Sequence, residues 1–582
     1  MPIRMEHIVF ISKIMSIFMF ILLITKIDCY PTKNQDHLYT YDDNLVFNEL
    51  SDESNLYEWP SFTCLGCKAG VALLHHLVKE GQSDKQLVHI IYKLCKNLRI
   101  ETQRVCEGIT NIMGDEFIYV FKNLKMTSSE ICGIVIEDEC GSLFSPAQDW
   151  NVTFPLIPKP PVRPLPPPVH GKPTMEVLHL SDYHYDPYYA PRSNAECGEP
   201  MCCRENSGKP NSEDSAAGWW GSYGKCDIPK HTIDNMLQHI ATNHKDIDYI
   251  LWTGDLPPHD VWNQTREGNI NILIETVDQI KYYFPTTPVC PALGNHESAP
   301  VNYFPPPFIK DNASIDYLYE ELDKELEWSA WLPNNTSSTI KKGGFYSVPV
   351  KPGFRIISVN TNYCNNKNWW LMLNTTDPAL ELQWLIDELQ LAESDNETVH
   401  IIGHIPPGPE DCLIGWSRNY YNIVNRYEST VTSQFFGHTH WDEFELHYDQ
   451  FDHKRVTSIA YIAPSVTTYE DLSPSYRIYS VEEDYEGSRR MALDHETWIM
   501  NLEDANLPGG IPNWFKLYSA KDAYNMTSLL PDEWNTIVDR MVEDKQMFEM
   551  FYKFYWHNSP RRPNCNSKCK KQMIKNLKSI RF

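Results

Sequence analysis

Two histidines, His438 and His440, stand one residue apart in the stretch FFGHTH, directly after an apolar run. Taken alone, such a pair is more typical of a surface turn than of a metal site. Four further apolar runs, however, also end in side chains that bind divalent cations. In chain order, the candidate ligands are Asp182, His184, Asp255, Asn295, His404, His438 and His440. Their assembly after five separate runs is improbable by chance and predicts one metal site.

These residue types suit the hydrolysis of a phosphoester. Histidine nitrogens and carboxylate oxygens are ligands of Zn²⁺. A carboxylate shared by two cations holds them ~3.5–4 Å apart, so that a bridging hydroxide attacks phosphorus while the cations neutralise developing charge. The departing alkoxide needs a proton, for which His259 and His296 are the candidate donors, although either could be a packed histidine. An imidazolium donor would favour acid pH.

Strands must position these ligands. From Met175 onward, short apolar runs end in polar clusters, and segments with helical spacing, such as residues 378–394, lie between several of them. Buried strands that alternate with helices predict an α/β layered core over residues 174–493, with its site where the strands end. Glycine precedes the ligand in four of the five clusters and permits a tight turn.

The remaining regions differ in composition. Residues 60–144 hold six cysteines and segments with helical spacing, which open with capping boxes at Ser83/Gln86 and Thr127/Glu130. Residues 145–173 are rich in proline and predict an extended linker. Residues 494–582 predict a helical C-terminal domain whose aromatic residues pack on the core, with contact to lipid as the alternative.

The N-terminus predicts secretion. Residues 1–29 combine Arg4 with an apolar run shorter than the ~20 residues of a membrane-spanning helix, which is typical of a signal peptide. Without Cys29, fifteen of the sixteen cysteines remain, so disulfides and at least one free thiol are expected. Glycosylation sequons begin at Asn151, Asn312, Asn335, Asn374, Asn396 and Asn525, and also at Asn263 and Asn334. We expect a secreted or lysosomal protein.

The net charge of −26 argues against nucleic acid as a partner, because phosphate binding needs a basic face. The 21 histidines titrate near pH ~6.5, so the chain would approach anionic lipid more readily in an acid compartment.

The ordered ligand set resembles the calcineurin-like metallophosphoesterase superfamily, whose fold is a sandwich of two mixed β-sheets flanked by helices. The resemblance implies two Zn²⁺ ions per chain, bridged by Asp255. One ion would take Asp182, His184, Asp255 and His440, and the other would take Asp255, Asn295, His404 and His438. The related purple acid phosphatases bind ferric iron through a tyrosine at the position of Pro258, so ferric iron is not expected here.

The six-cysteine block resembles a saposin-type domain, a helical fold that binds lipids. With the linker, the catalytic region and the segments PMCCR, GDLPPHDVW, ALGNHESAPVN and LDHETWIMNL, the chain resembles the acid sphingomyelinase family over nearly its whole mature length. Spacing alone leaves fifteen pairings of the six cysteines open. The resemblance implies the disulfides Cys64–Cys140, Cys67–Cys132, Cys95–Cys106, Cys197–Cys202, Cys203–Cys226, Cys364–Cys412 and Cys565–Cys569. It leaves Cys290 as a buried thiol and places Asn302 near the lipid headgroup. The basic stretch after Cys569 departs from the family because it lacks further cysteines.

The resemblance implies a zinc-dependent phosphodiesterase that cleaves sphingomyelin to ceramide and phosphocholine at acid pH. It would act as a peripheral monomer on sphingomyelin-containing membranes or lipoproteins. Two alternatives are a phosphodiesterase for nucleotides or other soluble diesters, and an inert saposin-like lipid-binding protein. The complete set of seven candidate ligands argues against an inert protein.

Overall fold

The computed structural model describes residues 64–97, 99–136, 148–162, 168–169, 171–324, 328–408 and 411–578. The predicted signal peptide, Cys140 and the linker residues 145–147, 163–167 and 170 lie outside these residues. The chain forms two compact units, Met1–Asp149 and Trp150–Phe582. No helix in the described part of the chain has the length and apolar character needed to cross a bilayer.

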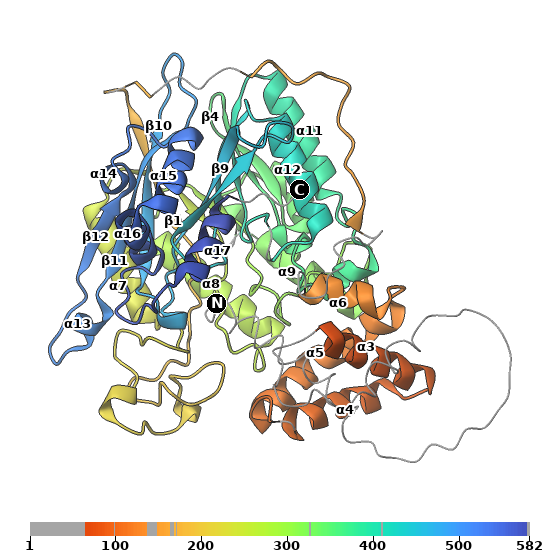
Figure 1. Ribbon diagram of the computed structural model, residues 1–582. Helices are drawn as coiled ribbons and strands as arrows, with labels where there is room; N and C mark the ends of the chain where they lie inside the picture. The colour runs from red at the N-terminus through yellow and green to blue at the C-terminus, as the bar shows by residue number, and fades with distance from the viewer. Residues whose placement is uncertain are drawn as a thin grey trace. The chain divides into compact units, whose positions relative to one another are not determined.

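The described part of the N-terminal unit contains four helices, coloured red to orange in Figure 1: α3 (Cys64–Lys79), α4 (Asp84–Asn97), α5 (Gln103–Asn123) and α6 (Ser128–Ile136). At the start of α6, the Thr127 N–H donates to Glu130 while the Glu130 N–H donates to the Thr127 hydroxyl, as the capping box predicts. Cys67–Cys132 joins α3 to α6, and Cys95–Cys106 joins α4 to α5. The predicted Cys64–Cys140 pair includes a residue outside the described ones. The unit is helical, and its saposin-type character stays a prediction.

The described residues of the C-terminal unit form two six-stranded sheets, as the sandwich fold requires. The first has the order β12-β11-β10-β1-β2-β3. Its strands are β1 (Thr174–Leu180), β2 (Ile247–Trp252), β3 (Val289–Pro291), β10 (Ser475–Glu482), β11 (Ala492–Met500) and β12 (Trp514–Ser519). The second has the order β4-β5-β6-β7-β9-β8. Its strands are β4 (Tyr346–Lys351), β5 (Phe354–Ser358), β6 (Thr398–Ile402), β7 (Val431–Phe436), β8 (Glu443–Tyr448) and β9 (Val456–Ile462).

Both sheets are mixed, which confirms the predicted fold class. In the first, β1, β2 and β3 are parallel and the pairs from β1 through β12 are antiparallel. In the second, β5, β6, β7 and β9 are parallel, with β4 and β8 antiparallel at the two edges. Rings from the two sheets meet in the core, where Phe435 of β7 lies 4.9 Å from Tyr479 of β10 between ring centroids. The sequences of the parallel strands are continuous apolar runs because both faces of these strands are covered.

Helices flank the sheets (Figure 1). Their bounds are α7 (Lys230–Asn243), α8 (Arg266–Tyr283), α9 (Asp316–Leu322), α10 (Ser337–Gly343), α11 (Glu381–Ser394) and α12 (Ile414–Arg426). Helix α11 contacts β6 and lies beside α12, and α7 contacts α8.

The predicted domain boundary at residue 493 falls inside β11. Strands β11 and β12 extend the first sheet, so residues 494–582 belong to the same compact unit as the catalytic region. The helices that follow are α13 (Leu502–Asn506), α14 (Ala520–Tyr524), α15 (Pro531–Glu543), α16 (Lys545–Tyr555) and α17 (Ser567–Leu577). The aromatic residues of α16 are core residues: Phe554 stacks on Tyr518 of β12 at 4.0 Å, and Tyr555 stacks on Trp441 at 4.9 Å. The prediction of core packing is therefore confirmed at these positions.

Four predicted disulfides also form in this unit: Cys197–Cys202, Cys203–Cys226, Cys364–Cys412 and Cys565–Cys569. Cys290 is the free cysteine among the described residues and is buried in β3, as predicted.

Candidate metal centre

The seven predicted ligands come from loops at the carboxyl ends of five parallel strands. Asp182 and His184 follow β1, Asp255 follows β2, and Asn295 follows β3, so the first sheet supplies four of them. The second sheet supplies the others, after β6 and β7. Backbone hydrogen bonds tie neighbouring loops together, such as Asp182 N–H to Gly254 O at 2.9 Å. The predicted gathering of ligand loops at strand ends is confirmed.

A first cluster contains Asp182, His184 and His440. His184 Nε2 lies 3.1 Å from His440 Nε2, and His440 Nε2 lies 3.6 Å from Asp182 Oδ1. Asp255 Oδ2 lies 3.6 Å from His184 Nε2. The four ligands expected for one cation therefore lie close together.

A second cluster contains Asp255, His404 and His438. His404 Nε2 lies 3.1 Å from the same Asp255 Oδ2, 3.0 Å from Asn295 Oδ1 and 3.2 Å from His438 Nδ1. Asp255 thus contributes to both clusters, which is the position that the resemblance gave it.

The chemistry of these atoms fits divalent cations. The Nδ1 atoms of His184 and His404 bond to the carbonyls of Pro257 and Thr253, at 2.9 and 2.6 Å. When Nδ1 donates to a carbonyl, a neutral ring presents a lone pair at Nε2. Both Nε2 atoms nevertheless face further nitrogen or oxygen atoms within 3.2 Å. A proton satisfies one such contact, whereas a cation satisfies all of them, so the residues fit a divalent metal centre.

Burial and charge shift the pKa values of the ligands. Burial raises the pKa of Asp182 to about 7. Burial acts in the same direction on Asp255, but His404 and His296 outweigh it and hold the pKa of Asp255 well below its usual range. Burial would lower the pKa of His404, yet the charge of Asp255 raises it to about 9. Such strongly shifted groups in one cluster are typical of functional sites.

The ligand loops have an unusual backbone. Five ligands have left-handed φ angles, from 44° to 71°: Asp182, His184, Asp255, His438 and His440. This conformation costs about 1–3 kcal/mol per residue outside glycine and concentrates at functional sites. Two glycines make room for the loops. A Cβ on Gly437 would lie 1.9 Å from Ser181 Oγ, and one on Gly294 would lie 2.2 Å from Asp255 Oδ1.

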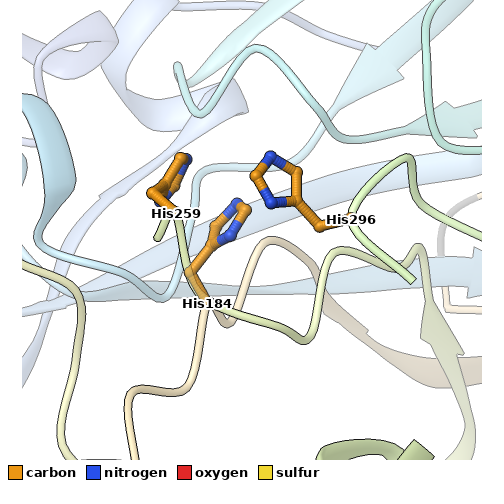
Figure 2. Close-up of side chains that lie close together, drawn as sticks. All are labelled: His184, His259 and His296. Carbon is orange, nitrogen blue, oxygen red and sulfur yellow. The ribbon is translucent and has the colours of Figure 1, made fainter. Parts of the chain in front are cut away.

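The two candidate proton donors lie beside the first cluster. The His259 ring is 3.8 Å from the His184 ring, and the His296 ring is 4.7 Å from it, between centroids (Figure 2). Asp227 receives a hydrogen bond from the His259 backbone N–H at 2.7 Å, and its other oxygen lies 2.8 Å from His259 Nδ1. The Tyr469 ring stacks on the His259 ring, with 3.9 Å between their centroids.

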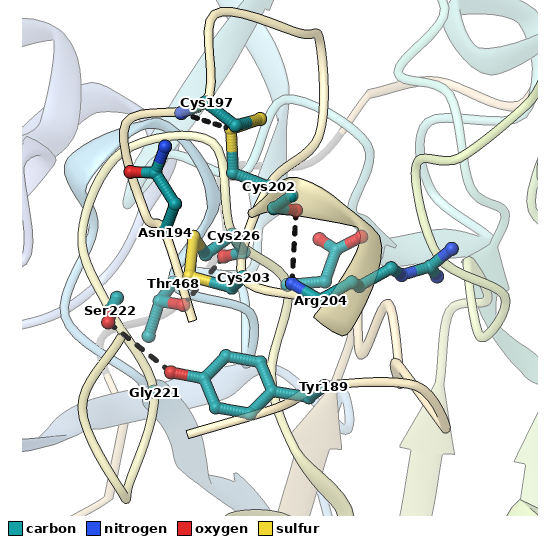
Figure 3. Close-up of a disulfide and its surroundings, with 12 residues drawn as sticks. Tyr189, Asn194, Cys197, Cys202, Cys203, Arg204, Gly221, Ser222, Cys226 and Thr468 are labelled. Atoms are coloured by element: carbon teal, nitrogen blue, oxygen red, sulfur yellow. Dashed lines mark hydrogen bonds between the residues drawn. A yellow bond between two sulfur atoms is a disulfide. The ribbon is translucent and has the colours of Figure 1, made fainter. Parts of the chain in front are cut away.

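Sequence reasoning missed Asp227, which lies in a loop without regular structure next to Cys226. Cys226 forms a disulfide with Cys203, and Arg204 follows Cys203 in the sequence (Figure 3). Arg204 forms buried ion pairs with Asp186 and Asp260, two residues after His184 and one after His259. The spacing of cysteines carried no information on these contacts.

Asn302 lies in the loop that carries Asn295 and is buried. Its N–H donates to Asn295 O at 3.0 Å, and its side-chain oxygen accepts from Asn365 Nδ2 at 3.0 Å. These contacts hold the loop, and the predicted contact with a headgroup stays a prediction.

Comparison with known proteins agrees with this fold and site. Residues 175–442 match the calcineurin-like phosphoesterase family, and residues 454–580 match the acid sphingomyelin phosphodiesterase C-terminal region. The two-sheet sandwich and its Asp/His clusters thus define a metallophosphoesterase.

Three relatives make the assignment finer. The human sphingomyelin phosphodiesterase is 42% identical over 518 residues, which cover 89% of this chain and 81% of that protein. Sphingomyelin phosphodiesterase 2 of Caenorhabditis elegans is 36% identical, over 85% and 83% of the two chains. The bovine cyclic GMP-AMP phosphodiesterase SMPDL3A is 31% identical, over 70% of this chain and 89% of its own. The chain belongs to the acid sphingomyelinase family and is a phosphoric diester hydrolase.

Proposed function

We propose that the protein is a zinc-dependent phosphodiesterase that hydrolyses sphingomyelin to ceramide and phosphocholine, with highest activity at acid pH. The observation that carries the proposal is the position of the Asp255 carboxylate. Its Oδ2 atom lies 3.6 Å from His184 Nε2 and 3.1 Å from His404 Nε2. A shared carboxylate between two sets of nitrogen and oxygen ligands is typical of two-metal hydrolases. The names of the nearer relatives support sphingomyelin as the substrate.

Two Zn²⁺ ions would be held by the two ligand sets described above. When bound, such ions activate a water and neutralise charge on the phosphoryl oxygens. In the overall reaction, the bond between phosphorus and the ceramide oxygen breaks, phosphocholine gains the hydroxyl of water, and the ceramide oxygen gains a proton.

His259 and His296 would supply that proton. Asp227 engages His259 at Nδ1, which leaves Nε2 as the atom that transfers a proton. Since the donor must be an imidazolium, activity should rise as the pH falls through the titration range of histidine, near ~6.5.

The protein would act in an oxidising compartment, as a secreted or lysosomal glycoprotein. Six disulfides among the described residues support this, because disulfides are rare in reducing compartments. The side chains of the six predicted glycosylation sites are all exposed, which such a modification requires. The helical N-terminal unit would hold the lipid, and the protein would work as a monomer on membrane or lipoprotein surfaces.

Product analysis tests the proposal. Labelled sphingomyelin in vesicles is incubated with the full chain at pH 5 and pH 7, with and without a chelator, and phosphocholine is quantified. We expect more product at pH 5, loss of activity with chelator and recovery with zinc. Deletion of residues 64–140 should impair vesicle turnover more than turnover of a small soluble diester.

One relative supports a different substrate, because it is named a cyclic GMP-AMP phosphodiesterase. A nucleotide diester is therefore assayed in parallel. Faster turnover of the nucleotide than of sphingomyelin, together with no effect of the N-terminal deletion, would overturn the lipid proposal.

A further inference from the structure

His438 differs from two other histidine ligands in how its second ring nitrogen is held. His184 and His404 direct Nδ1 to backbone carbonyls, which the fold itself fixes. His438 directs Nδ1 toward His404 Nε2 and has its Nε2 3.3 Å from Asp411 Oδ2. A side-chain carboxylate, rather than the backbone, therefore contacts the outer nitrogen of this ligand.

Asp411 is itself held in place. Its other carboxylate oxygen accepts from Lys367 Nζ at 2.5 Å, and its backbone carbonyl accepts from the Asn366 N–H at 3.0 Å. The next residue, Cys412, is bonded to Cys364 and pairs with Asn365 in an isolated β-bridge. Two segments far apart in sequence thus clamp the aspartate, and its side chain is only 27% exposed.

We propose that Asp411 is a positioning residue for His438 and thereby sets the metal affinity of the second ligand cluster. The carboxylate accepts the hydrogen on His438 Nε2, which keeps the lone pair on Nδ1, the atom that lies 3.2 Å from His404 Nε2 in the second cluster. Carboxylates that orient ligating histidines in this way also raise the basicity of the ring, and their removal lowers metal affinity by about 10–100-fold.

The inference is selective, and it deepens the proposed two-metal function on which it rests. His438 belongs to the second cluster only, whereas His184 and His440 belong to the first. Loss of Asp411 should therefore weaken one metal position and leave the other unchanged.

The test is a zinc titration. The full chain is stripped with a chelator and titrated with Zn²⁺ alone by calorimetry and by competition with a chromophoric chelator. We expect two sites per chain in the wild type. In Asp411→Ala, one site should lose about 10–100-fold in affinity and the other should match the wild type. Excess zinc should restore most of the activity of this variant.

Asp323→Ala is the matched control. Asp323 also pairs with one lysine, Lys341 at 2.6 Å, and its side chain is 14% exposed, but it lies at the end of α9, outside the ligand clusters. This variant should show both wild-type sites. Because an alanine at position 411 also frees Lys367, Asp411→Asn serves as a second variant that keeps the side-chain volume, and it should lose part of the same affinity.

Two outcomes would overturn the inference: wild-type titrations in both position-411 variants, or equal weakening of both sites. The proposed function fails separately, if a wild-type chain that binds two zinc ions does not cleave sphingomyelin. That result would leave the role of Asp411 in metal binding intact.

Discussion

The carboxylate of Asp255 joins two ligand clusters through one oxygen, and its backbone has a left-handed φ of 59°. Replacement by alanine removes a ligand from both clusters at once. We expect Asp255→Ala to lower phosphodiesterase activity by at least about 10²–10³-fold, since it removes charge stabilisation at the reacting phosphoryl group. The variant should also bind fewer zinc ions per chain by elemental analysis.

The control for this prediction is Asp248→Ala, in β2, the strand that Asp255 follows. Asp248 lies 3.6 Å from Lys351 and is 31% exposed. Its replacement should preserve activity and metal content. Undiminished cleavage of sphingomyelin by Asp255→Ala would refute the assignment of the site.

Gly437 provides a test that changes no ligand. An added Cβ would lie 1.9 Å from Ser181 Oγ and 2.7 Å from Asp182 Oδ2, so the turn before His438 must shift. Gly437→Ala should cost about 1–3 kcal/mol of stability, as overpacking does. Activity should fall by about 10²-fold, because displacements near 1 Å have such effects at active sites.

Gly487→Ala separates these two effects. Gly487 has a φ of 88° and no atom within 4 Å of its added Cβ. Its replacement should cost about 1–2 kcal/mol through backbone strain while leaving activity intact. Thermal unfolding measures the stability of both variants, and the vesicle assay measures their activity. Full activity in Gly437→Ala would contradict the close approach of the loops that carry Ser181 and Gly437.

Among the elements, β10, β11, β12 and the turn after β7 share one buried polar network. Asp442 pairs with the Arg477 guanidinium of β10 and accepts from the Tyr518 hydroxyl of β12 at 2.7 Å. Thr497 of β11 donates to its other oxygen at 2.7 Å. The network thus connects the turn that contains His438 and His440 to three strands of the first sheet.

Removing members of this network should have graded effects on the free energy of unfolding. Asp442→Ala leaves the Arg477 charge buried without its carboxylate and should cost about 3–5 kcal/mol. Tyr518→Phe removes one donor and should cost about 1–3 kcal/mol. Urea unfolding measures both, with Tyr282→Phe as a control because Tyr282 is 77% exposed. A larger cost for Tyr518→Phe than for Asp442→Ala would contradict this account.

The elements also show what sequence patterns can and cannot predict. Strands β1, β2, β6 and β7 were predictable because both of their faces are buried, which makes them continuous apolar runs that end abruptly in ligands. Strands β11 and β12 were not, since the partly exposed Asp494 and Glu496 and the exposed Lys516 interrupt their apolar pattern. Helical periodicity is clear only after residue 530, and it led to the prediction of a helical domain over all of residues 494–582.

The same limit applies to the site. The seven ligands follow strands and could be recognised by type and order. Asp227 and Asp411 each lie beside a disulfide cysteine in a loop, and their partners, His259 and His438, are remote in sequence. No local spacing encodes such contacts, because loop conformation there is set by the tertiary structure.

For the molecule as a whole, acid pH has a cost in stability. Burial lowers the pKa of His447 to about 3, and burial also lowers the pKa of His400 and His557 to about 4. An unfolded histidine titrates near ~6.5, so below that pH the unfolded chain binds more protons than the folded one. Each such histidine therefore makes its full contribution to the free energy of unfolding above pH ~6.5. That contribution falls as the pH drops toward ~4, and at pH 5 the loss is about 2 kcal/mol per histidine.

Replacement of one buried histidine should flatten this dependence. In His447→Phe, the loss of unfolding free energy between pH 7 and pH 5 should be about 2 kcal/mol smaller than in the wild type. Denaturant unfolding at both pH values measures it. The exposed His453, replaced in the same way, should leave the difference unchanged. An identical pH dependence in His447→Phe would contradict the buried neutral state of this ring.

The Cys203–Cys226 bond has a practical consequence for anyone who produces this protein. Its two neighbours are Arg204, which pairs with Asp186 and Asp260, and Asp227, which contacts the proposed proton donor His259. We therefore expect the loops of His184 and His259 to be held in place only after these two sulfurs have been oxidised. Material made in a bacterial cytoplasm should contain polypeptide that is soluble yet poorly active, whereas expression through a eukaryotic secretory route should yield competent enzyme.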